Sequence, residues 1–276
     1  MDSNHFDGPR MSPAQIDAYL ARIGLTGPVP LTLEGLSTLQ RAHQQSVPFE
    51  NIAILAGRPL SLDHEALFDK LVTRRQGGVC AELNTLYNWL LWSLGFTVRS
   101  FSARVLTPFH IFFRRHRVLG VTLDGRLYTT DVGFTTEHAR RPLLLEEGVV
   151  QHDGSCEYVY RREPFFGWVE LQRKPGEDWT RVLGFTDEPQ ADGDFLPVLF
   201  YFEHSPASNM NQMTRVSLYT SDTQIRALRH HDYLVEEHGQ PVERRPLTPE
   251  EELRLARDEF GMDTTGIAPD RISPRD

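Results

Sequence analysis

Cys80 is the residue whose type and position most clearly indicate chemistry. It follows Gly77 and Gly78 and opens a run of apolar residues with helical spacing that ends at Gly95. We therefore predict that Cys80 begins a helix, where unpaired backbone N–H groups and the helix dipole favour a thiolate. The glycines are expected to allow a tight turn and a close approach of substrate. Because a free cysteine is more often inert packing, a nucleophile also requires a base within reach.

A base for Cys80 has to be selected by position, because the chain contains 11 histidines. The dipeptide Asp124-Gly125 predicts a two-residue hairpin loop, which pairs Val118 with Asp131. His116 then lies on the same face as Asp131 and diagonal to it. Diagonal neighbours are about 7–8 Å apart, within reach of two side chains that lean together. We predict a hydrogen bond between His116 and Asp131.

Other readings of these residues are available. His110 shares the face but lies roughly 20 Å further along an extended strand, and His138 follows the end of the hairpin. His116 could also be a solvated charge among three neighbouring arginines, with Asp131 merely ending a strand. A helix-start cysteine together with a His/Asp pair on one face favours a Cys-His-Asp triad instead.

The elements that must position these residues change type along the chain. Residues 12–94 show helical spacing, and from Phe96 onward the spacing alternates as in strands. The predicted helices are 12–23, 33–43, 63–72 and 80–94, and the predicted strands are 97–105, 117–123, 126–132, 158–160, 168–171 and 179–183. The middle third is therefore expected to be an antiparallel sheet or small barrel. A strand over 215–219 and a helix from Thr248 follow, and residues 265–276 are expected to form a loose tail.

Composition excludes several classes of function. A net charge of −9 argues against a nucleic-acid binder, and no apolar run is long enough to span a membrane. Cys80 and Cys156 are the only cysteines, which fits neither a disulfide framework nor a zinc site, and Cys156 is expected to be structural. We expect a cytoplasmic protein without a metal and without a nucleic-acid or membrane partner.

Four motifs in order resemble the arylamine N-acetyltransferase family, over residues 12–262. They are the Arg-Xaa-Gly-Gly-Xaa-Cys-Xaa-Glu-Xaa-Asn pattern at 75–84, the segment 47–52, the segment Asp131-Val132-Gly133-Phe134 after a strand-borne histidine, and the segment 205–208. The resemblance implies an α+β fold with an N-terminal helical bundle, an antiparallel β-barrel and a C-terminal α/β lid, around a cysteine-protease-like core. We place these parts at 1–96, 97–203 and 204–276, the last including the tail.

The same resemblance implies roles for individual residues. Cys80 would be the nucleophile, His116 the base and Asp131 the group that orients it. Substrate-binding positions are Phe49, Val79, Phe134 and Met210, and cofactor-binding positions are Gly133 and Thr135. The chain departs from the family pattern at Gln76, Val79, Thr135 and Met210. These departures would change which acceptor and which acyl donor it uses.

The implied reaction is a two-step acyl transfer with ping-pong kinetics. Cys80 takes an acetyl or other acyl group from a CoA thioester and passes it to an arylamine, hydrazine or N-hydroxyarylamine. No cofactor is bound permanently, and acetyl-CoA is a co-substrate. The alternative is an amide synthase that receives its acyl group from an acyl carrier protein, with Arg140 and Arg141 as candidate phosphate contacts. A cysteine amidohydrolase and a non-catalytic binding protein are two further readings.

Overall fold

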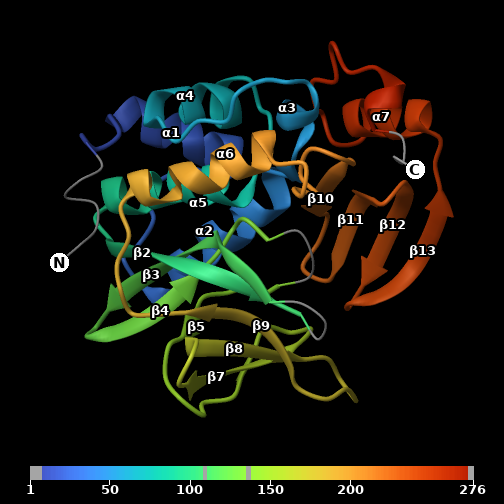
Figure 1. Ribbon diagram of the computed structural model, residues 1–276. Coiled ribbons are helices and arrows are strands. Elements are labelled where there is room, and N and C mark those ends of the chain that lie inside the picture. Colours follow the sequence, from blue (N-terminus) through green and yellow to red (C-terminus); the bar gives the residue numbers. More distant parts are fainter. Residues whose placement is uncertain (1–7, 108–110, 135–137, 273–276) are drawn as a thin grey trace.

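The computed structural model describes residues 8–107, 111–134 and 138–272. His110 and Thr135, both considered above, lie outside these residues. The described chain forms a layer of helices, an eight-stranded sheet and a five-stranded sheet (Figure 1). The predicted α+β class, with a helical bundle, a barrel and a C-terminal α/β part, is confirmed.

The helical layer is built around α5 (Cys80–Leu94), whose first twelve residues are all buried. Gly95 ends this helix with a φ of 109°, a conformation that favours glycine. Ser12 and Gln15 form the expected capping box at the start of α1. The remaining helices of this layer are α1 (Pro13–Arg22), α2 (Leu33–Ser46), α3 (Ile52–Leu55), α4 (His64–Phe68), which continues as a π-helical turn over Asp69–Thr73, and α6 (Leu196–His204).

The eight-stranded antiparallel sheet curls into a nearly closed barrel. Its strands, in order across the sheet, are β5 (Leu143–Leu144), β4 (Arg126–Thr130), β3 (Ile111–Leu123), β2 (Thr97–Leu106), β9 (Thr180–Phe185), β8 (Gly167–Arg173), β7 (Glu157–Glu163) and β6 (Gln151–His152). A parallel bridge between Glu147 and Tyr160 joins the segment after β5 to β7, across the gap between the two edges.

The hairpin between β3 and β4 has the predicted register. Asp124 and Gly125 form its loop with φ values of 49° and 74°, and Leu119 pairs with Thr130. The ladder stops one residue before Asp131, so the chain leaves the sheet with Asp131 directed toward α5. This turn therefore determines which residues of β3 lie nearest Asp131.

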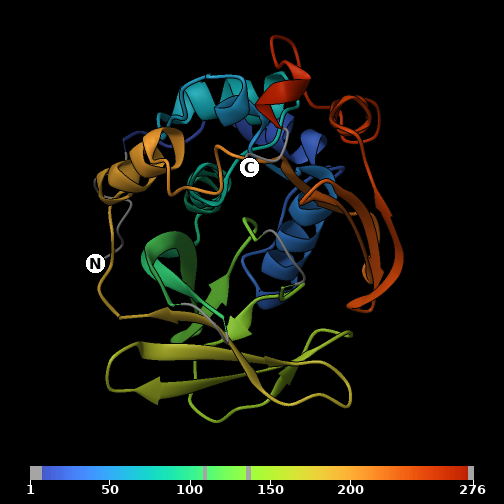
Figure 2. The same cartoon turned by 45° about the vertical axis from the view of Figure 1, so that its right-hand side comes forward.

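The five-stranded sheet combines distant parts of the chain. β1 (Phe49–Glu50) pairs with β10 (Arg215–Tyr219), followed by β11 (Gln224–Arg229), β12 (Asp232–Glu237) and β13 (Gln240–Pro246). Helix α7 (Pro249–Asp258) and α3 share one apolar cluster with this sheet. Figure 2 shows the sheet beside α2, on the flank of the helical layer and above the barrel. The division at residues 96 and 203 stays a prediction.

The prediction of a loose C-terminal tail from residue 265 was wrong for its described part. Residues Pro269–Arg271 form a 3-10 turn, and Ile267 and Ile272 are buried in the cluster formed by α3, α7 and the five-stranded sheet. Two isolated isoleucines among prolines and charges carry no periodic signal. Their burial depends on the apolar surface that α3, α7 and the five-stranded sheet form together.

Candidate active site

The start of α5 is held by a buried carboxylate. Glu82 Oε2 accepts a hydrogen bond from the backbone N–H of Val79 at 3.2 Å and one from Lys70 Nζ at 2.7 Å. Lys70 also lies 3.7 Å from Glu50 Oε1. The glutamate two residues after Cys80 therefore satisfies a helix-terminal donor and links the helix to the neighbouring segments. Cys80 is the first helical residue and is 5% exposed.

The two glycines before Cys80 serve packing rather than a tight turn. Neither has a positive φ. A Cβ on Gly77 would lie 2.2 Å from the carbonyl oxygen of Pro48, and a Cβ on Gly78 would lie 2.9 Å from Glu82 Oε2. The expectation of a tight turn was wrong. Residues without a side chain are needed at positions 77 and 78 because Pro48, before β1, and the Glu82 side chain lie against them.

His116 and Asp131 meet beneath the start of α5, as the register predicted. His116 Nε2 lies 2.5 Å from Asp131 Oδ2, and both side chains are buried. The other carboxylate oxygen, Asp131 Oδ1, accepts hydrogen bonds from Asn84 Nδ2 and from the Gly133 backbone N–H, each at 2.8 Å. The carboxylate is thus fixed from both sides.

The electrostatics of this pair favour its charged form. Burial lowers the pKa of His116, but the charge of Asp131, its hydrogen bond and the Cys80 side chain outweigh burial and raise that pKa to about 10. For Asp131, burial raises the pKa, and the charge and hydrogen bond of His116 dominate and lower it below 3.8. At neutral pH the imidazole is therefore protonated beside an ionised carboxylate.

Cys80 lies close to the same imidazole. Nε2 of His116 is committed to Asp131, and the interaction with the Cys80 side chain is one of the causes that raise the pKa of His116. The Cys80 Sγ also lies 3.6 Å from the backbone oxygen of Arg115. A sulfur, an imidazole and a carboxylate that lie close together are the groups that nucleophilic catalysis by a cysteine requires.

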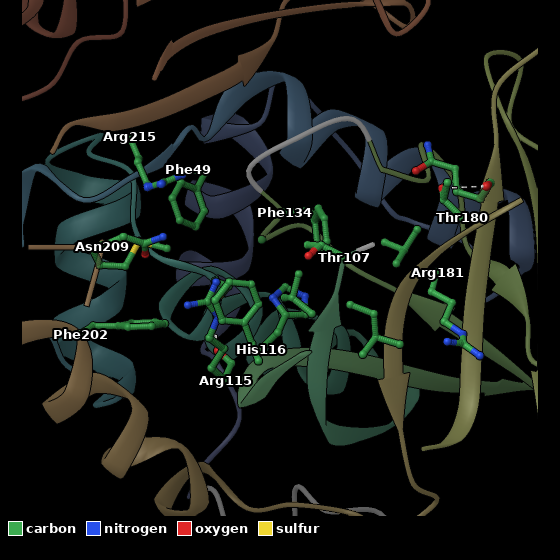
Figure 3. A pocket seen from close by; sticks show the side chains of 18 residues that line it. Phe49, Thr107, Arg115, His116, Phe134, Thr180, Arg181, Phe202, Asn209 and Arg215 are labelled. Carbon is green, nitrogen blue, oxygen red and sulfur yellow. Dashed lines mark hydrogen bonds between the residues drawn. The ribbon is translucent and has the colours of Figure 1, made fainter. Parts of the chain in front are cut away.

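A cavity of about 420 Å³ opens over Cys80 and His116, between the barrel and the five-stranded sheet (Figure 3). Phe49, Phe134, Met210 and Gly133, which we expect to contact the substrates, line it. Val79 does not line it, since its side chain is fully buried as the N-cap residue of α5. The other described lining residues are Val105, Leu106, Thr107, Phe112, Arg115, Gln172, Thr180, Arg181, Val182, Phe202, Asn209 and Arg215.

Sequence reasoning missed a second buried acid–histidine pair. His138 Nε2 lies 2.8 Å from Glu170 Oε1 inside the barrel, and Tyr160 donates to Glu170 Oε2. The His138 ring stacks on Phe134 with centroids 4.4 Å apart, and Phe134 meets His116 edge-on at 5.2 Å. This pair supports the cavity wall from behind, and only the barrel closure brings His138 and Glu170 together.

Asn84 was also missed as a functional position, although a signal was present. It lies one helical turn after Cys80, so both face the same direction from α5. Besides Asp131, its Nδ2 donates to the Arg117 backbone oxygen at 2.8 Å, and its Oδ1 accepts from Val132 N at 3.1 Å. Asn84 therefore ties the hairpin end to the helix that carries the sulfur.

Cys156 and Arg140, both considered from the sequence, are buried and contribute to packing. Cys156 is fully buried in the barrel core, as expected. Arg140 is also buried, with its guanidinium 3.7 Å from the ring centroid of Tyr219 and 2.8 Å from the Ser221 backbone oxygen. Arg141 is exposed. Neither arginine lines the cavity.

The described residues contain neither a metal-binding cluster nor a membrane-spanning helix. Within 8–107, 111–134 and 138–272, no cluster of three or more His, Cys, Asp or Glu side chains is arranged to hold a metal ion. In the same ranges, none of the helices combines the length and the apolar character needed to cross a bilayer.

Residues 32–267 match a family model described as N-acetyltransferase. The chain is 35% identical over 219 residues, 75% of each protein, to the arylamine N-acetyltransferase of Mycobacterium tuberculosis. The chain belongs to the arylamine N-acetyltransferase family. It is also 34% identical over 196 residues, 70% of this chain and 69% of its relative, to an arylamine N-acetyltransferase / N-hydroxyarylamine O-acetyltransferase of Salmonella typhimurium.

Solved structures of arylamine N-acetyltransferases have the same fold. The Mycobacterium marinum enzyme in complex with CoA superposes with a TM-score of 0.84 at 28% identity, covering 93% of this chain and 96% of that one. The similarity thus includes the helical layer, the barrel and the C-terminal sheet together. The chain is an acyltransferase of this family.

Proposed function

We propose that this protein moves an acyl group from a CoA thioester through Cys80 to an aromatic amine, hydrazine or N-hydroxyarylamine. The carrying observation is that His116, hydrogen-bonded to Asp131, lies with Cys80 in the wall of one aromatic-lined cavity. Family membership supports the reaction class, and the CoA complex of the M. marinum relative supports CoA as the donor's carrier. Acetyl-CoA is the expected co-substrate.

In the proposed first step, Cys80 is acylated. The Cys80 sulfur attacks the thioester carbonyl carbon, and the carbon–sulfur bond to CoA breaks. His116, protonated at rest, gives its proton to the departing CoA sulfur. The products are the Cys80 thioester, a neutral imidazole and CoA with its thiol restored. The backbone N–H of Cys80, at the start of α5, is the proposed donor to the carbonyl oxygen as negative charge develops there.

In the proposed second step, the amine nitrogen attacks the acyl carbon on Cys80. The neutral His116 accepts a proton from that nitrogen, and the bond to sulfur breaks. The thiolate–imidazolium pair is regenerated and the amide leaves. Asp131 binds Nε2 of His116, and Asn84 binds Asp131. These hydrogen bonds keep the imidazole in one orientation through both steps and do not involve Nδ1, the proposed reacting nitrogen.

Gly133, Phe134, Phe49 and Met210 are proposed as the walls that receive the substrates. Three of them are large apolar side chains, which suits an aromatic ring. The flexible Met210 adapts to acceptors of different shape. Val79 and Thr135 stay predictions as substrate and cofactor contacts, the first buried behind the cavity and the second outside the described residues.

Steady-state kinetics test this proposal. With acetyl-CoA and 4-methylaniline varied together, a shared acyl-enzyme predicts parallel double-reciprocal lines. Cys80→Ala abolishes turnover, whereas Cys156→Ala, in the barrel core, retains it. Intersecting lines, or transfer that survives Cys80→Ala, would contradict the proposal. Activity with a carrier-protein thioester but with no CoA thioester would instead indicate an amide synthase. Cleavage of an amide in the absence of an amine would indicate a hydrolase.

A further inference from the structure

The cavity over Cys80 is lined by basic but not acidic side chains. Arg115, Arg181 and Arg215 line it, and none of its described lining residues is Asp or Glu. The whole chain nevertheless carries a net charge of −9. The positive character of this wall is therefore opposite to the charge of the protein as a whole.

Two of these arginines lack a carboxylate partner. Arg181 is paired, with its Nε 3.0 Å from Glu163 Oε1. Across the described part of the chain, Arg115 and Arg215 form no ion pair, and Arg115 places its guanidinium 3.6 Å from the Phe112 ring centroid. Nε of Arg215 is buried without a hydrogen-bond partner among the described residues. A buried donor left unsatisfied carries a desolvation cost that a bound acceptor would remove.

The charges of these arginines are also unfavourable in the present structure. Burial, together with the charges of the neighbouring Arg229 and Arg115, lowers the pKa of Arg215 to about 10. Burial likewise lowers the pKa of Arg115, against smaller opposing effects of Cys80 and Tyr201. Arg229 faces Arg215 across the β10–β11 pair. An anion between Arg115 and Arg215 would relieve this repulsion.

The two arginines lie on one side of the cavity, with aromatic walls beside them. Figure 3 shows Arg215 next to Phe49, and Arg115 next to His116, on the side of Asn209 and Phe202, whereas Thr180 and Arg181 lie on the opposite side. A ligand here meets an aromatic surface and two guanidinium groups close to the reacting sulfur. A guanidinium matches a carboxylate with two parallel hydrogen bonds.

From this arrangement we propose that Arg115 and Arg215 bind a carboxylate on the substrate, so that the protein prefers anionic substrates to neutral ones of the same shape. The inference rests on the proposed acyl transfer and names its substrate class. The carboxylate can belong to the acceptor, as in an aminobenzoate, or to the acyl group of the donor, as in a dicarboxylic acid monothioester. Both present the same chemistry to the same two side chains.

The test compares each anion with a neutral molecule of similar shape. The acceptor arm measures kcat/KM for 4-aminobenzoate and 4-aminobenzamide, with p-nitrophenyl acetate as a donor that has no phosphates. The donor arm compares malonyl-CoA with isovaleryl-CoA, with 4-methylaniline as acceptor. We expect a preference of about 10- to 100-fold for the anion in one arm, the size of a charge-assisted pair. The arm that shows it identifies the source of the carboxylate.

Substitutions connect that preference to the two arginines. Arg215→Gln and Arg115→Gln should each reduce the ratio by about tenfold or more. Arg226→Gln is the matched control, because it removes an exposed arginine from β11 of the same sheet and should leave the ratio unchanged. A ratio cancels general effects on folding or on the neighbouring His116.

Two results would overturn the inference. One is the absence of an anion preference in both arms. The other is a preference that Arg115→Gln and Arg215→Gln leave intact while the KM for acetyl-CoA rises, which would assign these arginines to CoA phosphates. Acylation of Cys80 by p-nitrophenyl acetate is measured in parallel. If it occurs without an anion preference, only the present inference fails, and if it never occurs, the proposed function fails first.

Discussion

Gly133 lies against the backbone of Cys80, so closely that a Cβ at position 133 would come 2.8 Å from the Cys80 Cα and 3.0 Å from its carbonyl oxygen. It would also lie 2.8 Å from Asn84 Nδ2. The segment that carries Asp131 therefore approaches α5 without a side chain between them. This contact sets the distance between the helix with the sulfur and the loop that orients the imidazole.

Gly133→Ala should separate these two segments. Inserting a methyl group into a tight contact costs about 1–3 kcal/mol of stability, and a displacement near 1 Å at a catalytic group costs about 100-fold in rate. The measurements are thermal unfolding and kcat/KM for acyl transfer. Gly193→Ala is the control, because a Cβ there meets no atom within 4 Å, so it should change neither quantity. Wild-type activity in Gly133→Ala would refute this role of the contact.

Asn84→Ala should weaken the orientation of Asp131. The substitution removes a donor to Asp131 Oδ1 and to the Arg117 backbone oxygen, and leaves Val132 N without its acceptor. Buried groups left unpaired cost about 1–3 kcal/mol each, so the melting temperature and kcat should both fall. Gln45→Ala, which loses one hydrogen bond to Asp222 away from the site, is the comparison. Equal effects of the two substitutions on kcat would argue against a positioning role for Asn84.

The stability that His116 contributes should decrease with rising pH. Its pKa is raised from 6.5 to about 10, so this contribution is complete below about 6.5 and is lost as the pH rises through about 10. The pKa of Asp131 is lowered, so its contribution is present above 3.8 and is lost as the pH falls below that value. The difference in unfolding free energy between wild type and His116→Gln should therefore be larger at pH 6.5 than at pH 10.

Urea unfolding of both proteins across this pH range measures that difference. His204→Gln replaces an exposed histidine away from the site and is the control for the exchange of histidine for glutamine. A difference that is constant between pH 6.5 and 10 would mean that His116 is not charged beside Asp131 in the folded protein.

Glu170→Ala should destabilise the barrel strongly. Burial lowers the pKa of His138, but the charge and hydrogen bond of Glu170 outweigh burial and raise it, so removal of Glu170 leaves a buried imidazolium or forces its deprotonation. Breaking a buried ion pair costs about 3–5 kcal/mol. Glu146→Ala breaks an exposed pair with Arg126 and should cost at most about 1 kcal/mol. Similar unfolding free energies for the two variants would contradict this assignment.

Local sequence signals were sufficient for the parts of the site that depend on one hairpin and one helix. Asp124-Gly125 determines the register of β3 and β4, and that register places His116 beside Asp131. The helix start at Cys80 follows from the two glycines before it and the apolar spacing after it. These features depend on short separations along the chain, where periodicity and turn chemistry are informative.

The remainder depends on contacts between distant segments. Arg215 reaches the cavity because β10 pairs with β1, far earlier in the chain, and no local pattern predicts that pairing. His138 and Glu170 meet only because the barrel curls around them. Ile272 is buried because α3, α7 and the five-stranded sheet form a common surface for it. Contacts between residues so far apart in the sequence can be identified only in the folded protein.

Peptide mass spectrometry after mixing the protein with acetyl-CoA, in the absence of an amine, tests the central claim most directly. We expect the mass of one acetyl group on the peptide that contains Cys80, none on the peptide that contains Cys156, and loss of the label when an arylamine is added. An unlabelled Cys80 with acetyl-CoA and every other thioester donor tried, or a label on another residue, would contradict it.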